Sequence, residues 1–168
     1  YFKKLNYLFV INFSKKILIH LIINLLPKYN LFDKARGFFF ILLRVKAGKN
    51  FKVGSNVLIF SPEKLIVGDN CFIGVMSYLG NGYIKIGNNV LIGNHVSILP
   101  SNHSSKGSDN FRFGEIDQKQ INISDDCWIC AQSIITAGVT ISEKTLVAAG
   151  TKVLRSNKDD KFIKNIYK

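Results

Sequence analysis

One stretch of this 168-residue chain repeats with a period of six. Between Ile123 and Val153 every sixth residue is a branched aliphatic, and four positions after each of the first five stands a small or branched side chain. A helix repeats every 3.6 residues and a strand every two, so neither gives this period. A solenoid does, because six residues can form one short strand and one turn, and three such sides close a triangular coil.

The same period fits most of residues 47–158 and predicts about five three-sided coils. Nine further aliphatic positions are in step: Ala47, Val53, Ile59, Val67, Ile73, Leu79, Ile86, Ile92 and Ile98. Glycine follows most of them, which allows close turns without a Cβ. The phase slips at 61–64 and 83–85, and residues 104–120 interrupt it as an inserted loop. We therefore expect a β fold over 47–158, a helical flank over 1–46 and a basic tail over 159–168.

The repeat resembles that of the bacterial hexapeptide-repeat acyltransferases, whose fold is a left-handed parallel β-helix. It is most similar to the sugar O-acetyltransferases of the galactoside and colanic acid type. The segments that carry the resemblance are 86–93, 102–103, 127–131, 137–141 and 148–151. The resemblance implies acetyl-CoA as co-substrate, a saccharide as acceptor, no metal, and a homotrimer with sites between adjacent solenoids.

Of the three histidines, His103 is the candidate general base. His20 lies on the polar stripe of a predicted helix, and His95 falls at a corner that faces outward. His103 stands where the chain leaves the solenoid, and loops that leave a rigid scaffold often carry active sites. The resemblance places a general base at this position. A neutral imidazole there could take the proton of a sugar hydroxyl as it attacks the acetyl thioester.

The acetyl-CoA site is predicted from the resemblance. Trp128 and Ala131 match a stretch that lines the pantetheine groove, and Ala149 and Gly150 match a turn beside it. Arg155 falls where relatives have a lysine near the CoA phosphates, and a guanidinium suits phosphate well. Trp128 follows an inward residue on a short strand, so it should face outward. The segment after Arg155 departs from the family pattern.

The acceptor site is less sharply defined. We expect Asn102, Lys106 and Arg112 to contact the saccharide, while Phe111 and Phe113 either stack on a sugar or pack the loop. Galactoside-type relatives place an asparagine one coil before the histidine, and that place is an isoleucine here. The acceptor therefore does not follow directly from the resemblance.

Two observations limit other chemistries. The pair Cys127 and Cys130 has CxxC spacing, but Cys127 occupies an inward slot of the repeat and only one further cysteine exists, Cys71. A zinc site of the carbonic anhydrase type needs three histidines, and the repeat holds two. Three cysteines do not make a disulfide framework, which favours a reduced, cytoplasmic protein.

The net charge of +12 is concentrated in the flanks. Residues 1–50 hold ten Lys or Arg and one Asp, whereas the repeat region is nearly neutral. Residues 12–26 form an amphipathic pattern with a narrow polar stripe, and a second helix is expected from about 32 to 45. These helices either cap the open end of the solenoid or lie on the anionic inner membrane surface, and the two roles are compatible. Nucleic-acid binding has no supporting motif.

Together these features favour an acetyl-CoA-dependent O-acetyltransferase acting on a saccharide, for example a cell-surface polysaccharide or its precursor. Two alternatives remain open at this point: N-acetylation of an amino-sugar nucleotide, and a non-catalytic solenoid that scaffolds a glycan assembly.

Overall fold

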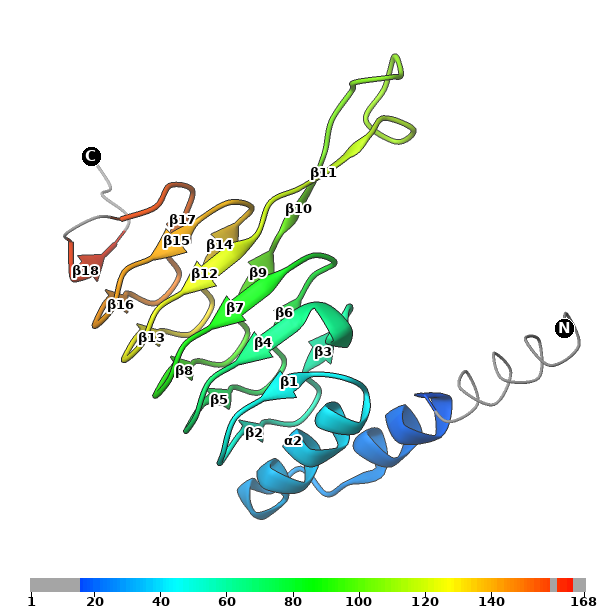
Figure 1. Cartoon of the computed structure of the whole chain (residues 1–168), viewed down its shortest axis with the longest axis vertical. Helices are drawn as coiled ribbons and strands as arrows, with labels where there is room; N and C mark the ends of the chain where they lie inside the picture. Colours follow the sequence, from blue (N-terminus) through cyan, green and yellow to red (C-terminus); the bar gives the residue numbers. More distant parts are fainter. Residues whose placement is uncertain (1–15, 158–159, 165–168) are drawn as a thin grey trace, which may run out of the picture.

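Short parallel strands wind into a three-sided prism that forms most of the molecule (Figure 1). The computed structural model describes residues 16–157 and 160–164. Strands that follow one another in the sequence lie on different sides, and strands one coil apart pair in parallel on the same side. The fold predicted from the period of six is thus confirmed as a parallel β-solenoid.

Each side of the prism is a sheet of strands from successive coils, here named sides A, B and C in chain order. Side A contains β1 (Lys46–Ala47), β4 (Leu65–Val67), β7 (Ile84–Ile86), β12 (Ile121–Ile123) and β15 (Thr140–Ile141). Side B contains β2 (Lys52–Val53), β5 (Phe72–Ile73), β8 (Leu91–Ile92), β13 (Trp128–Ile129), β16 (Leu146–Val147) and β18 (Phe162–Ile163). Side C contains β3 (Leu58–Ile59), β6 (Tyr78–Leu79), β9 (Ser97–Leu99), β14 (Ile134–Thr136) and β17 (Lys152–Val153).

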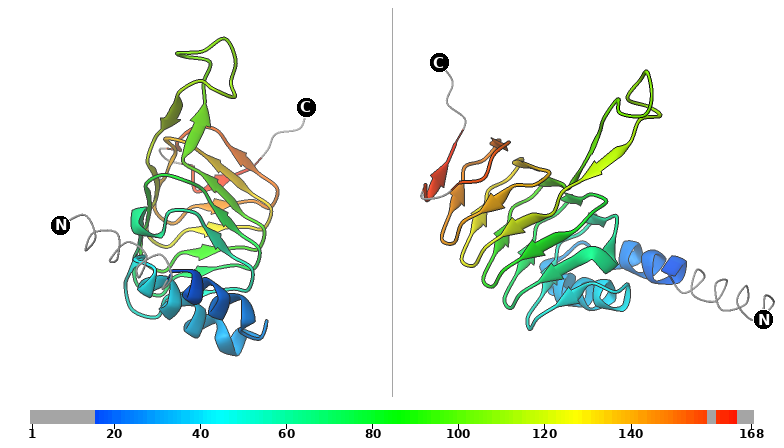
Figure 2. Two further views of the ribbon diagram at one scale, coloured as in Figure 1. Left: turned by 90° about the vertical axis from the view of Figure 1, so that its right-hand side faces the viewer. Right: turned by 45° about the horizontal axis from the view of Figure 1, so that its top comes forward.

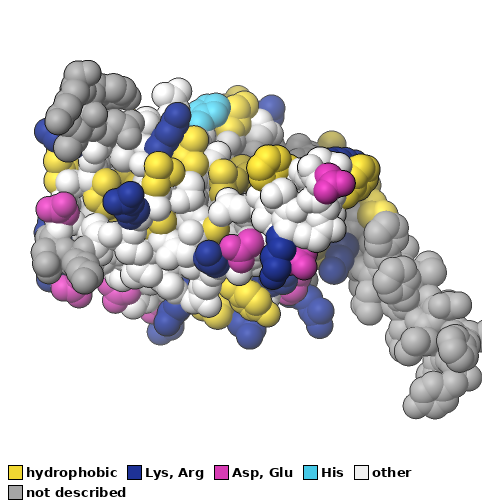
Figure 3. All heavy atoms as spheres, turned by 90° about the horizontal axis from the view of Figure 1, so that it is seen from above, with side chains coloured by type: hydrophobic (Ala, Val, Ile, Leu, Met, Phe, Trp, Pro, Cys, Tyr) yellow, Lys and Arg dark blue, Asp and Glu magenta, His cyan; other side chains and the backbone are white. Residues whose placement is uncertain are grey.

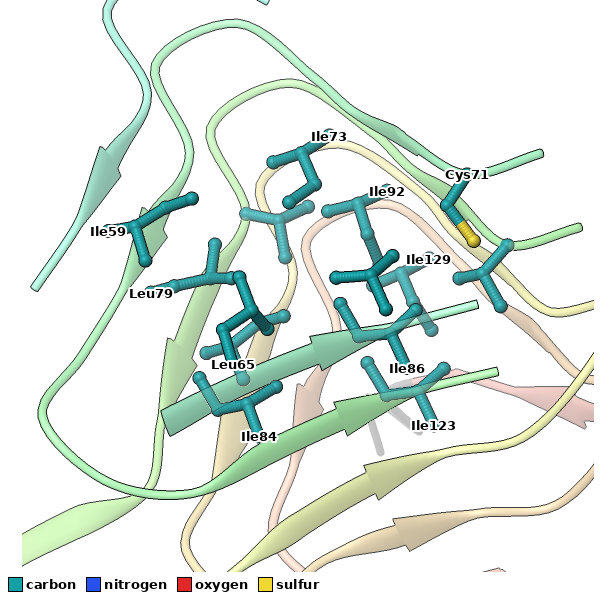
Figure 4. Close-up of a cluster of buried hydrophobic side chains, with 14 of the residues drawn as sticks. Ile59, Leu65, Cys71, Ile73, Leu79, Ile84, Ile86, Ile92, Ile123 and Ile129 are labelled. Atoms are coloured by element: carbon teal, nitrogen blue, oxygen red, sulfur yellow. The ribbon is translucent and has the colours of Figure 1, made fainter. Parts of the chain in front are cut away.

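The core is a stack of inward aliphatic side chains, one from each two-residue strand and two from each three-residue strand of side A, such as Ile84 and Ile86 of β7 (Figure 4). Ile73, Ile98 and Ile129 are fully buried. The small slots of the repeat also point inward, where the Ser77 and Ser133 hydroxyls donate to backbone carbonyls of the next coil. The period of six therefore places at least one large and one small side chain of each repeat inside the prism.

The corners of the prism show why the repeat contains glycine, and the reason is not the turn geometry that we expected. Gly74 has no left-handed backbone angle, but a Cβ there would lie 2.5 Å from the Gly93 carbonyl oxygen of the next coil. The close approach of stacked coils, not the turn itself, requires glycine. The left-handed residue comes two positions later, for example Met76 and His95, both with φ of 57°.

The solenoid continues further than the sequence predicts. Five complete coils are present in the described residues, and β18 adds a strand of a sixth by pairing with β16. This strand lies inside the segment 159–168 that we assigned to a basic tail. The period of six did not predict β18 for two reasons. The chain passes side A without forming a strand, and the last coil is shortened to sixteen residues between Val147 and Ile163.

Two side chains take the place of that missing strand. The Thr140 backbone N–H donates to the Ser156 hydroxyl at 2.8 Å, and the Ser142 N–H donates to Asn157 Oδ1 at 2.9 Å. The Asn157 amide also donates to the Ser142 and Thr145 hydroxyls at 2.8 and 3.1 Å, and to the Asp160 carbonyl. The N–H groups of Thr140 and Ser142, at the free edge of β15, are thereby satisfied without another strand.

Helices cover the other end of the prism (Figure 2). Residues 16–25 are helical, and a 3-10 turn, η1 (Asn30–Phe32), leads into α2 (Asp33–Leu42). The predicted helix of 12–26 falls partly outside the described residues. Its Ile23 is buried, and α2 packs so closely on the first coil that a Cβ on Gly37 would clash with the Phe51 carbonyl oxygen. The expected capping role is therefore observed.

Candidate active site

A β-hairpin leaves the prism at the corner between sides C and A and projects away from it (Figures 1 and 2). Its strands are β10 (Ser101–His103) and β11 (Ile116–Gln118), which pair in antiparallel register. His103 is the last residue of β10, lies opposite Ile116 and is exposed. The chain thus leaves the solenoid two residues before His103, so that the imidazole stands on the hairpin and not on side C.

The predicted acceptor residues are all on this hairpin and exposed. Asn102 lies opposite Asp117 at its root. Lys106 Nζ pairs with a Glu115 carboxylate oxygen at 3.4 Å, while the Arg112 guanidinium lies 6.0 Å from the Phe113 ring at the tip. Figure 3 looks down on this end and shows basic and acidic side chains together on it. Lys106 therefore already has an anionic partner within the hairpin. Arg112 is nine residues beyond His103 in the sequence, near the tip of the hairpin.

Side B carries an apolar row on its outer surface. Trp128 is 48% exposed and faces outward, as expected from its position after the buried Cys127. In the register of the sheet it lies between Leu91 and Leu146, and the same row includes Phe72 and Phe162. An outward aromatic in such a row presents a broad surface for a ligand or a neighbouring protein.

Three of the predicted CoA residues come together at the corner between sides B and C. Ala131 follows β13, and Ala149 and Gly150 follow β16 one coil later. The Gly150 N–H donates to the Ala131 carbonyl at 2.9 Å, and Gly150 has a left-handed φ of 71°. Arg155 is exposed but follows β17, at the corner between sides C and A. It is therefore not beside these three residues.

His103 and Trp128 are on different parts of the prism within one chain. His103 stands at the corner between sides C and A, whereas Trp128 lies on side B. Interior side chains fill the space between the sides. Within one chain, therefore, the two residues do not share a surface.

The cysteines have the environment of structural residues. Cys71 and Cys127 are buried, and burial is the main reason why the pKa values of both thiols are raised. The Cys127 thiol donates to the Ser142 carbonyl at 3.1 Å. Burial also raises the pKa of Cys130, which is partly exposed. Because a thiolate is the reactive form, these raised pKa values disfavour a cysteine nucleophile.

A shallow groove of about 380 Å³ lies on side A, lined in part by Lys85, Asn122, Asp125 and Glu143. It extends to the corner between sides A and B, so it belongs to a different corner from the hairpin. Within the described residues, no group of three His, Cys, Asp or Glu side chains could hold a metal ion.

One cluster was not predicted from the sequence. The turn η2 (Pro62–Lys64) lies at the same corner as the hairpin, and Lys64 Nζ donates to Gln118 at the hairpin root. Tyr83 is 58% exposed, with Lys64 Nζ 5.6 Å from the centre of its ring. The only signal in the sequence was that Lys64 and Tyr83 both stand at slips in the period.

Comparison with known proteins agrees with this fold. Residues 64–100 match the family model described as the hexapeptide repeat of succinyl-transferase. The chain is 30% identical over 122 residues to WcaF of Escherichia coli K12, which is named as a colanic acid biosynthesis acetyltransferase. That match covers 72% of this chain and 65% of the relative, so the chain spans slightly less than two thirds of the length of this relative.

Solved structures share the architecture. A hexapeptide-repeat acetyltransferase of Vibrio cholerae, solved with acetyl-CoA, is 26% identical to this chain with a TM-score of 0.72. The superposition covers 85% of this chain and 76% of the Vibrio chain. A maltose O-acetyltransferase of Clostridium difficile has a TM-score of 0.75 at 23% identity, with 85% and 75% covered, and shows the fold alone. The chain thus contains a hexapeptide repeat in a β-solenoid and is similar to known acetyltransferases, which confirms the resemblance seen in the sequence.

Proposed function

We propose that this protein is an acetyl-CoA-dependent O-acetyltransferase that acetylates a hydroxyl of a saccharide, such as a cell-surface polysaccharide or its precursor. The observation that carries this proposal is the position of His103, exposed at the root of a hairpin in a chain related to acetyltransferases. The WcaF relative and the acetyl-CoA complex of the Vibrio protein support the donor and the acceptor class.

The reaction needs one proton acceptor and two well-placed substrates. The His103 imidazole takes the proton of the sugar hydroxyl while its oxygen attacks the thioester carbonyl. The tetrahedral oxyanion then collapses, the C–S bond breaks, and the CoA sulfur leaves and receives the proton from the imidazolium. Holding both substrates in one groove supplies much of the remaining rate enhancement. No covalent enzyme intermediate is required.

The donor groove would follow the outer surface of side B. Trp128 offers an apolar face for the pantetheine chain, while the corner formed by Ala131, Ala149 and Gly150 has small residues that let a chain approach the backbone. Arg155 lies at the corner between sides C and A, so it would reach the CoA phosphates only if the nucleotide end of CoA extended to that corner. An Arg155 supplied by a second subunit could lie closer to the nucleotide.

We also infer a cyclic homotrimer in which each site lies between two subunits. The outward row of side B is largely apolar, with Trp128 and Leu91 in it, and that of side C combines Leu58 and Ile134 with the polar Ser97 and Lys152. The row of side A includes Lys85, Asn122 and Thr140. If side C of one subunit faces side B of the next, His103 approaches the partner's Trp128. A closed ring is the common solution for such unlike surfaces.

Thiol release from acetyl-CoA with a panel of sugars tests the chemistry. His103→Ala should abolish sugar-dependent release. His95→Asn should retain it, because His95 is an exposed corner residue. Its backbone is left-handed, and asparagine adopts that conformation readily. Undiminished release by His103→Ala would refute the assigned base. Mixed trimers of His103→Ala and Trp128→Ala chains should regain activity, because some of their sites combine intact residues from both chains.

The alternatives give different results in the same experiments. An N-acetyltransferase would release thiol only with amino sugars, particularly as nucleotide conjugates. A non-catalytic scaffold would release none, and CoA at millimolar concentration would not raise its melting temperature. We favour O-acetylation because the motifs of the repeat resemble those of the sugar O-acetyltransferases. The name of the WcaF relative, a colanic acid biosynthesis acetyltransferase, agrees with a saccharide acceptor.

We further propose that the helical end contacts the anionic inner surface of the cytoplasmic membrane. Seven apolar side chains of the two helices are exposed: Ile17, Leu18, Leu21, Leu25, Phe38, Ile41 and Leu42. Lys16, Lys34 and Arg44 are exposed among them, and the first 50 residues hold ten cationic residues against one acidic. Within the described residues no helix is long and apolar enough to cross a membrane. Such a surface fits peripheral binding.

Vesicle sedimentation tests this contact. The protein should sediment with vesicles containing anionic phosphatidylglycerol and much less with neutral phosphatidylcholine, and added salt should weaken the binding. Leu21→Glu should reduce sedimentation, with Ile66→Glu on side A, outside the proposed subunit interface, as the matched control. Equal sedimentation with both lipids would contradict the charge argument. A cytoplasmic location is part of the same proposal, and the free cysteines agree with it.

A further inference from the structure

The irregular segments of the repeat meet at one corner of the prism. The turn η2, the turn before β7 and the hairpin of β10 and β11 all lie between sides C and A, in three successive coils (Figure 1). Everywhere else in these coils the period of six is kept. Five residues of these segments form what we call the corner cluster: Ser61, Lys64, Asn81, Tyr83 and Gln118.

The corner cluster surrounds one ammonium group. Lys64 Nζ donates to Asn81 Oδ1 and to Gln118 Oε1, both at 3.4 Å, and lies 5.6 Å from the centre of the Tyr83 ring. The Ser61 hydroxyl donates to the same Asn81 oxygen at 2.8 Å, which fixes this amide. Lys64 is half-buried, so its stem is held by the protein and its charged end is confined to this corner.

The charge of Lys64 is not neutralised by the residues that hold it. Its contacts are two amide oxygens and an aromatic ring, and none of these is an anion. Among the described residues the ion pairs are made by Arg36, Lys106 and Lys119. Partly buried cations are usually paired, because desolvation is unfavourable. An anionic ligand would complete this environment.

The register of the hairpin places the partner of this ammonium on the strand opposite the proposed base. Gln118, which accepts from Lys64 Nζ, is opposite Ser101, and His103 follows Ser101 by two residues of β10, which is roughly 7 Å at the rise of a strand. A sugar whose hydroxyl reaches the imidazole could therefore place an acidic substituent, or the acid of its neighbouring residue, at Lys64. The exposed Tyr83 ring stands beside the ammonium and offers a face on which a sugar ring can stack.

We propose that the corner cluster binds the acceptor and selects an acidic saccharide, with Lys64 pairing its carboxylate or phosphate group. This inference rests on the proposed function and specifies its substrate class. In this arrangement Lys64 is a specificity-determining residue that contacts the acceptor outside the reacting hydroxyl. Asn81 and Gln118 position its ammonium, and Ser61 positions Asn81.

The first test compares matched acceptors. Thiol release would be measured with three acceptors: methyl glucuronide, methyl glucoside and glucose 1-phosphate. Each would be assayed with the wild type, with Lys64→Met and with the control Lys119→Met. Lys119 is an exposed lysine of the same hairpin region and pairs with Asp117. A hydrogen-bonded charge contributes about 1.5–3 kcal/mol, so Lys64→Met should lower kcat/KM for an acidic acceptor roughly 10- to 150-fold. The value for the neutral glucoside should change less than about threefold. The two acidic acceptors distinguish carboxylate from phosphate.

An equal loss on neutral and acidic acceptors would overturn the proposal, because it would mean that Lys64 only holds the hairpin in place. The same holds if the wild type prefers the glucoside.

A second measurement does not need turnover. Saturation-transfer NMR should show glucuronic acid binding to the wild type, weaker binding of glucose, and no glucuronic acid binding to Lys64→Met. Acid binding that persists in Lys64→Met would overturn the inference whether or not the protein is an enzyme. Specific acid binding without thiol release would instead refute the proposed O-acetyltransferase activity while the anionic subsite stands.

Discussion

Arg36 is a buried cation that fastens α2 to the first coil, and replacing it tests how the helices are held on the solenoid. The residue is 1% exposed, and its guanidinium donates to the Asp33 carboxylate at 2.7 Å, to the Pro27 carbonyl, and at 3.5 Å to the Val53 carbonyl. Arg36→Met keeps the apolar stem but leaves Asp33 without its cation. Removing one partner of a buried pair costs about 3–5 kcal/mol, and we expect a loss in this range.

The loss should depend on pH. Burial raises the pKa of the Asp33 carboxyl, while Arg36 opposes this shift. Because the pKa is raised in the folded state, this carboxyl favours folding below its unfolded pKa, and the contribution is lost as pH rises through the folded pKa. Without Arg36 the pKa should rise further. The Arg36→Met variant should therefore lose more stability than the wild type between about pH 4 and about pH 7.

Urea unfolding followed by the helical circular dichroism signal measures this effect at both pH values. Because coils of a solenoid contact only their neighbours, hydrogen exchange should localise the loss to α2 and the first coil. Asp33→Asn combined with Arg36→Met should recover a large part of the loss, and Lys34→Met on the exposed face should cost little. A loss below about 1 kcal/mol that does not change with pH would refute the reasoning.

Three further predictions follow from particular contacts. Asn157→Ala should lower the free energy of unfolding by about 1–3 kcal/mol, because the Ser142 N–H loses its acceptor and the Ser142 and Thr145 hydroxyls lose a donor; chemical denaturation measures this, and a neutral effect would contradict it. Iodoacetamide at about pH 8 should label Cys130 before Cys71 and Cys127 and all three slowly, because burial raises their pKa values and reduces the thiolate fraction, as mass spectrometry would show. Gly37→Ala should displace α2 and lower the melting temperature, despite the better helix propensity of alanine.

The sequence was sufficient to predict the solenoid, because few other folds bury one aliphatic residue at every sixth position. Inward and outward positions followed from the same count, as Cys127 and Trp128 show. The last strand was not predictable, because β18 follows a coil in which Ser156 and Asn157 replace a strand. The side chains of Ser156 and Asn157 accept hydrogen bonds that a strand would accept, but they do not follow the period of six.

The candidate site could be predicted only in part, for a related reason. His103 was recognisable because it stands at the one large interruption of the period. The association of Lys64 with Asn81 and Gln118 was not, because residues far apart in the chain become neighbours only through the register of stacked coils. The roles of His103 and of the CoA residues remain predictions for the experiments described above.

The two N–H groups satisfied at the edge of β15 also bear on how the molecule behaves at high concentration. A solenoid stacks its own coils edge to edge, so a bare terminal edge would be a template on which a second molecule could continue the stack. Along β15 the N–H groups of Thr140 and Ser142, which a second molecule would need as donors, already donate to acceptors within the chain. On side A the last coil therefore offers no free N–H donor at these two positions on which a second molecule could continue the stack, while the helices cover the first coil at the opposite end (Figure 2).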